Sequence, residues 1–161
     1  MRETLYKIAK NFRDAIKIAQ QESRNKNFMY FSLFPRGTCG TTCYMLAKYL
    51  SEETALNVNI YCVTGYCYKP DFSSHAWLEI LKIPKDPEQK WIVDITGDQF
   101  SENETFLNNN VPIYVDHGND FYGLWETKCS VYNSDNMYLE PEDNRCYRMI
   151  IDIIKNSLYY N

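Results

Sequence analysis

Three residues in the first hundred positions are of the types that together carry out nucleophilic catalysis: Cys39, His75 and Asp94. Cys39 follows the turn-forming Gly37 and opens a run with helical spacing, so its sulfur should lie at a helix N-terminus. Unpaired backbone N–H groups at that position favour a thiolate and lower the pKa of the thiol. Cys39 is therefore the candidate nucleophile, and a small buried structural cysteine is the competing interpretation.

His75 and Asp94 occur in two successive strand-like runs. A strand through His75 places it on the same face as Trp77, whereas Ala76 faces a core. Asp94 lies between apolar β-branched neighbours, where an unpaired carboxylate is costly to bury, so an imidazole N–H or backbone N–H groups must satisfy it. A thiol, a base and an orienting acid follow the logic of a catalytic triad, with the Cys39 backbone N–H as the oxyanion donor.

The elements that would position these residues follow from apolar spacing. Steps of three and four residues predict one helix over residues 3–22, a second from the cysteine turn onward and a third after Pro141. The strand-like runs predict an antiparallel meander; they are Val58 to Thr64, Ser74 to Ile83, Lys90 to Thr96 and Val111 to Val115. The first helix has a basic face, expected to be solvated, of Lys7, Lys10, Arg13 and Lys17.

These elements predict one α+β domain over residues 1–161. In this prediction, the helix that carries the cysteine packs on an antiparallel sheet, with further helices at the N- and C-terminal ends. The stretch from the fourth strand to about residue 140 has only a weak pattern.

Composition narrows the function classes. The 161 residues carry 17 Lys and Arg against 21 Asp and Glu, a net charge of −4, with 45% hydrophobic residues. This excludes intrinsic disorder and argues against nucleic acid as a partner. No apolar run approaches the roughly 18 residues of a membrane span, so no membrane partner is expected. Six cysteines without a recognisable signal sequence favour reduced thiols in a cytoplasm, with signal-independent export left open.

Further cysteine and histidine residues are candidates for a nucleophile, a metal ligand or a base. Cys43 lies one helical turn after Cys39 and is either a core residue or the rival nucleophile. Cys39, Cys43, Cys62 and Cys67 lack the tight spacing of zinc knuckles, so no metal is expected. His117 is expected in a surface loop.

Residues around the triad suggest a substrate groove. Trp77 and Gln99 are the candidate groove residues, and Asp98 and Gln99 have capping and turn roles as the alternative. Further aromatic side chains that could wall a groove for an extended peptide are Tyr66, Tyr68 and Trp91.

Four short runs together resemble the core of the transglutaminase-like cysteine enzymes, which belong to the wider papain-like group. The runs are Gly37-Thr38-Cys39, Val63-Thr64-Gly65, His75-Ala76-Trp77-Leu78-Glu79 and Trp91-Ile92-Val93-Asp94. The resemblance covers roughly residues 35–100. It implies a nucleophile at Cys39, a base at His75 and an orienting carboxylate at Asp94, without a cofactor. Many relatives carry a side-chain oxyanion donor upstream of the cysteine; the loose candidates are Gln20, Gln21, Asn25 and Asn27.

The resembled family includes peptidases, protein-glutamine deamidases, transglutaminases and amine acyltransferases, as well as members that have lost catalysis. We therefore expect a thiol hydrolase or acyltransferase that forms a thioester from an amide of a peptide or protein. The acyl group would then pass to water or an amine. The alternative is a non-catalytic binding module that keeps the fold and its groove.

Overall fold

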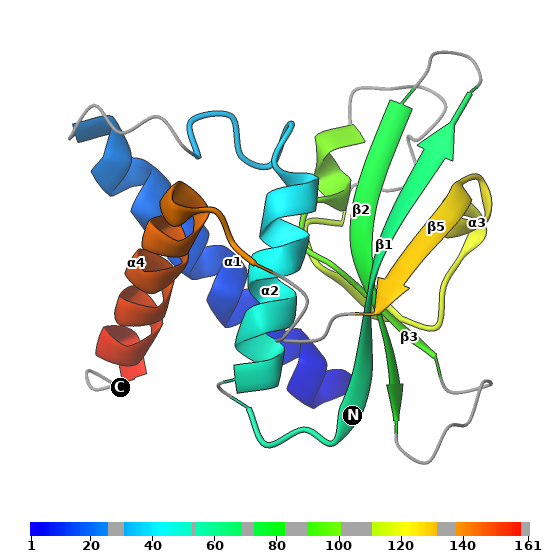
Figure 1. The fold of residues 1–161 in the computed structure, drawn as a ribbon, viewed down its shortest axis with the longest axis horizontal. Helices are drawn as coiled ribbons and strands as arrows, with labels where there is room; N and C mark the ends of the chain where they lie inside the picture. Colours follow the sequence, from blue (N-terminus) through cyan, green and yellow to red (C-terminus); the bar gives the residue numbers. More distant parts are fainter. Residues whose placement is uncertain are drawn as a thin grey trace.

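The computed structural model shows an α+β fold in which α1 and α2 pack on one face of a five-stranded antiparallel sheet and α4 packs against these helices (Figure 1). The elements are α1 (Arg2–Asn25), α2 (Cys39–Glu52), β1 (Val58–Cys67), β2 (Ser73–Lys82), β3 (Trp91–Asp94), η2 (Gly97–Phe100), β4 (Tyr114–Asp116), α3 (Asp120–Gly123), β5 (Glu126–Val131) and α4 (Pro141–Leu158). The structure describes residues 1–25, 31–52, 54–68, 73–82, 90–100, 111–131 and 138–158. Within these ranges, no helix has the length and apolar character needed to cross a bilayer.

The sheet has the strand order β4-β3-β2-β1-β5, so the predicted antiparallel meander from β1 to β4 is confirmed. β5 was not predicted, and it returns across the sheet to pair with β1 at the opposite edge. The third strand is shorter than expected and ends at Asp94, because the Thr96 N–H turns back to the Asp94 carboxylate. Of the fourth predicted strand, only the part from Tyr114 onward is in the sheet, and Ile83 of the second lies outside the described residues.

Both faces of the sheet are buried. The larger core lies between the sheet and the three long helices, and it contains the predicted inward-facing strand residues Ala76, Leu78 and Ile80. A second, mainly aromatic cluster covers the opposite face together with α3; its buried members are Val63, Cys67, Trp77, Ile92, Phe121, Tyr122 and Trp125. The helix that carries Cys39 and the strand that carries His75 are therefore each held by a packed layer.

The basic face of α1 is not wholly solvated, and the prediction was wrong for Arg13. Its side chain is 3% exposed, and its guanidinium donates to both carboxylate oxygens of Asp98, at 3.0 and 2.6 Å, and to the Ile95 carbonyl. The guanidinium also lies 5.0 Å from the ring centroid of Phe34. Helical spacing could not reveal this, because the carboxylate lies 85 positions further along the chain. Lys10 on the same face is exposed, as predicted.

Candidate active site

Cys39 is the first residue of α2, as predicted. A cis Phe34–Pro35 peptide bond and Gly37, whose φ of 68° favours glycine, turn the chain toward the helix. The Thr38 carbonyl accepts the first helical hydrogen bond, from the Thr42 N–H at 2.9 Å. The backbone N–H of Cys39 thus belongs to the first turn, where helical N–H groups have no partner within the helix.

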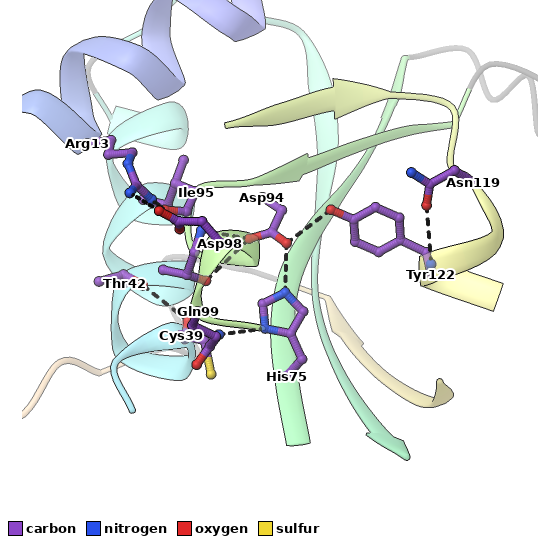
Figure 2. Close-up of polar contacts among 11 residues, drawn as sticks. Arg13, Cys39, Thr42, His75, Asp94, Ile95, Asp98, Gln99, Asn119 and Tyr122 are labelled. Carbon is purple, nitrogen blue, oxygen red and sulfur yellow. Dashed lines mark hydrogen bonds and ion pairs between the residues drawn. The ribbon is translucent and has the colours of Figure 1, made fainter. Parts of the chain in front are cut away.

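His75 is fully buried and has a polar partner on each ring nitrogen (Figure 2). Its Nε2 lies 2.7 Å from Asp94 Oδ2, and its Nδ1 lies 3.0 Å from Gln99 Nε2. An amide nitrogen can only donate, so when the ring is neutral Nδ1 accepts from Gln99 and Nε2 donates its proton to Asp94. This is the tautomer that a base needs if it is to take a proton through Nδ1.

Asp94 accepts hydrogen bonds from four donors. They include both kinds of partner predicted from the sequence, an imidazole N–H and a backbone N–H. Its Oδ2 accepts from His75 and, at 3.0 Å, from the Tyr122 hydroxyl. Its Oδ1 accepts from the backbone N–H of Thr96 at 2.8 Å and from the Thr96 hydroxyl at 3.2 Å. Burial alone would raise the pKa of this carboxyl, but His75 and the other donors outweigh burial and lower the pKa.

The electrostatics favour a thiolate beside an imidazolium. Burial would raise the pKa of the Cys39 thiol, but hydrogen bonding and charge from His75 outweigh it and lower the pKa, with help from the Ala76 N–H and the Gln99 side chain. Burial would also lower the pKa of His75, yet Asp94 raises it to about 9. The three predicted triad members therefore lie in one cluster, with Cys39 on the Nδ1 side of the ring and Asp94 bonded on the Nε2 side (Figure 2).

An aromatic cage surrounds the imidazole. Ring centroids of four side chains lie between 5.1 and 5.9 Å from that of His75, namely Trp77, Phe100, Phe121 and Trp125. Trp77 is only 2% exposed, which differs from the prediction that it walls an open groove. The reason is that α3 and Trp125 cover this face of the sheet. Trp77 therefore supports the imidazole ring.

A glycine makes this cage possible. Gly65 lies opposite His75 in the pairing of β1 with β2. A Cβ atom there would lie 2.6 Å from Trp125 Cβ and 2.8 Å from Trp77 Cη2, so any larger residue would push the two indoles apart. The Val63-Thr64-Gly65 run of the sequence thus has a packing role beside the candidate base.

The competing candidates lie elsewhere. Cys43 is 4% exposed, and burial and the neighbouring Cys62 raise the pKa of its thiol well above the ordinary value, which disfavours it as a nucleophile. His117 is in an exposed loop, as predicted, with its Nδ1 2.8 Å from the Lys90 carbonyl. Over the ranges that the structure describes, no group of three or more His, Cys, Asp or Glu side chains could hold a metal ion.

The upstream amide side chains that the structure describes, those of Gln20 and Gln21, have no hydrogen bond to the triad. Gln20 donates to the carbonyls of Ser32 and Phe34, at 3.3 and 3.5 Å, and Gln21 is exposed on α1. Asn27 and the side chain of Asn25 lie outside the described parts of the chain.

The sequence analysis did not identify Tyr122, whose hydroxyl donates to Asp94 Oδ2. The signal was present in Asn119, whose side chain caps α3 by accepting from the N–H groups of Phe121 and Tyr122, at 3.1 and 3.4 Å. An Asn-Asp pair before two aromatic residues predicts a helix start, but nothing in the sequence indicates that this turn packs over Asp94.

Comparisons with protein-family models, curated proteins and solved structures gave no match.

Proposed function

We propose that the chain is a thiol hydrolase or acyltransferase that acts on an amide bond through Cys39, His75 and Asp94. The observation that carries this proposal is the imidazole of His75, which lies 2.7 Å from Asp94 at Nε2 and lowers the pKa of the neighbouring Cys39 thiol. The lowered pKa of the Cys39 thiol supports a role as nucleophile. The resemblance to transglutaminase-like enzymes is part of the same proposal.

The chemistry runs in two halves. The Cys39 thiolate attacks the amide carbonyl carbon, forming a C–S bond and an alkoxide that the Cys39 backbone N–H can stabilise. When the C=O bond re-forms, the C–N bond breaks and protonated His75 gives its proton to the departing amine, leaving a thioester. Neutral His75 then takes a proton from water or an acceptor amine, which attacks the thioester and releases Cys39.

Asp94 orients the base and stabilises its charged form. Since His75 is fully buried, its imidazolium would be costly without a counter-charge at Nε2. The Tyr122 hydroxyl and the Thr96 N–H fix the carboxylate in turn, so the ring orientation is set by contacts outside the reacting pair.

The substrate is expected to be a peptide or protein. Among the described residues, one hollow between α2 and the sheet touches Cys39; its volume is about 10 Å³, roughly one water molecule. This hollow is too small to enclose a substrate. Cys39 is instead half-exposed at the end of a helix, which suits an amide presented on the surface of another chain.

The second candidate function is a non-catalytic binding module, favoured by the complete burial of His75 under its aromatic cage. A binding module has no need of a reactive thiol, so the two functions separate on the reactivity of Cys39.

The test is the pH dependence of iodoacetamide alkylation at each cysteine, resolved by peptide mapping, in the wild type and in His75→Ala. If the proposal is right, Cys39 alone reacts rapidly at about pH 6, and the replacement of His75 abolishes that advantage. Buried Cys43 serves as an internal comparison within the same helix. Ordinary reactivity of Cys39, equal in both proteins, would contradict the enzyme and favour the binding module.

A further inference from the structure

Gln99 contacts both the nucleophile and the base. Its Nε2 lies 3.0 Å from His75 Nδ1, and its side chain also helps to lower the pKa of the Cys39 thiol. Figure 2 shows the continuous set of contacts that runs from this amide through His75 and Asp94 to Tyr122. A residue that only lined a groove would not need to touch both reacting groups.

The position of Gln99 is fixed by buried contacts. Its backbone N–H donates to the Thr96 carbonyl at 3.1 Å, which forms the η2 turn directly after the strand that carries Asp94. The preceding residue, Asp98, is held by two hydrogen bonds from the buried Arg13 of α1. The carboxamide is therefore presented from a turn that is tied to both the sheet and a helix.

We propose that Gln99 Nε2 is the side-chain oxyanion donor of the reaction, acting together with the backbone N–H of Cys39. This inference rests on the proposed function. It also places the donor after the triad in the sequence, whereas the upstream candidates were Gln20, Gln21, Asn25 and Asn27.

The movement of charge during acyl transfer supports this role. Before attack, the negative charge is on Sγ; after attack, the sulfur is bonded to carbon and the charge is on the carbonyl oxygen, attached to that same carbon. The described groups that lower the pKa of the Cys39 thiol, and so favour negative charge on Sγ, are the His75 ring, the Ala76 N–H and the Gln99 amide. His75 gives its proton to the leaving amine, and the Ala76 N–H belongs to the backbone of β2. Only Gln99 offers a rotatable group with two N–H donors that can follow the charge.

Protonation of the base releases this donor. With His75 neutral, its Nδ1 can accept one N–H of Gln99, whose Nε2 lies 3.0 Å away. When the proton of the thiol moves to Nδ1, that nitrogen becomes a donor and no longer accepts the amide. The Gln99 N–H is then free to turn toward the sulfur and the oxygen that develops beside it. The step that creates the nucleophile therefore also frees the oxyanion donor.

The experiment compares two reactions of Cys39 in the same protein. Acylation by p-nitrophenyl acetate passes through a tetrahedral oxyanion, whereas alkylation by iodoacetamide is a displacement that has none. Both rates are measured at one pH in the wild type, Gln99→Ala and Gln99→Glu, and the ratio of acylation to alkylation removes any change in the thiolate fraction. Gln21→Glu, an exposed glutamine on α1, is the matched control.

The expected result is a ratio that falls about 10²–10³-fold in both Gln99 variants and stays unchanged in the control. Retained alkylation at Cys39 shows that the site is still assembled, and Gln99→Glu keeps the side-chain shape if the alanine variant fails to fold. A ratio within threefold of wild type in Gln99→Glu overturns the role of Gln99 and leaves the proposed function standing. Failure of the wild type to acylate at Cys39, judged against Cys39→Ser, overturns the proposed function itself.

Discussion

The replacement Asp94→Asn should remove the negative charge that raises the pKa of His75 while leaving the shape of the site intact. Asp94 raises the pKa of His75 from 6.5 to about 9 although the ring is fully buried. Without the carboxylate, burial opposes only the smaller effect of Cys39, and the pKa should fall toward 6.5. A return to 6.5 alone lowers the thiolate–imidazolium equilibrium constant about 300-fold, which corresponds to about 3 kcal/mol.

The assay is an NMR titration of the imidazole nitrogens. The chain has only two histidines, so His117→Ala is enough to assign the His75 signal. In the wild type, the signal should show an imidazolium up to about pH 9. In Asp94→Asn it should show a neutral ring at neutral pH, and alkylation of Cys39 at about pH 7 should slow by a factor of up to ~300.

The same substitution has a defined effect on stability. Protonated His75 stabilises the fold fully below 6.5, and this contribution is lost as the pH rises through about 9. Ionised Asp94 contributes above 3.8, and its contribution is lost as the pH falls through its lowered folded-state pKa. The stability difference between wild type and variant should therefore be largest from pH 3.8 to 6.5. Asp152→Asn, an exposed change on α4, is the control. A His75 pKa still near 9 in Asp94→Asn would refute the reasoning.

Two further predictions concern the packing that supports the site. Gly65→Ala should lower the free energy of unfolding by about 1–3 kcal/mol in urea, because the new Cβ would lie 2.6 Å from Trp125 Cβ. The control is Gly123→Ala, whose Cβ would meet nothing within 4 Å and which should cost far less. Equal losses in the two variants would contradict the role of Gly65 in the aromatic cage. Arg13→Met should cost about 2–3 kcal/mol because it leaves Asp98 without its cation, and adding Asp98→Asn should recover part of that loss; strictly additive losses would contradict the pairing.

The sequence was informative about the elements and the triad because both are encoded locally. Apolar spacing predicted α1, α4 and the meander, and the turn before Cys39 predicted the helix start. The strand pattern of His75 and Asp94 placed them on neighbouring strands, and the antiparallel pairing of β2 with β3 brings them within hydrogen-bonding distance.

What the sequence could not reveal depends on pairing over long separations. The helical pattern predicts that Arg13 is solvated, because its partner Asp98 in η2 lies 85 positions further along the chain. Tyr122 and Trp125 come from a stretch without periodicity, and only the return of β5 to the far edge of the sheet brings that stretch over His75. Trp77 was expected at an open groove because one strand face was assumed to be exposed, and this second layer buries it.

The buried charges of the site explain why so many segments converge on it. Cys39 and His75, which change charge during the proposed reaction, lie in one cluster with the ionised Asp94. Each of the three needs compensation that neighbouring residues in sequence do not supply. Asp94 receives two donors from its own turn but needs Tyr122 of α3 to complete its second oxygen. Gln99 lies beside His75 on a turn that Arg13 of α1 anchors through Asp98. The second layer and the first helix therefore stabilise the reacting pair as well as the fold, which is why variants at Arg13 or Gly65 should alter Cys39 reactivity along with stability.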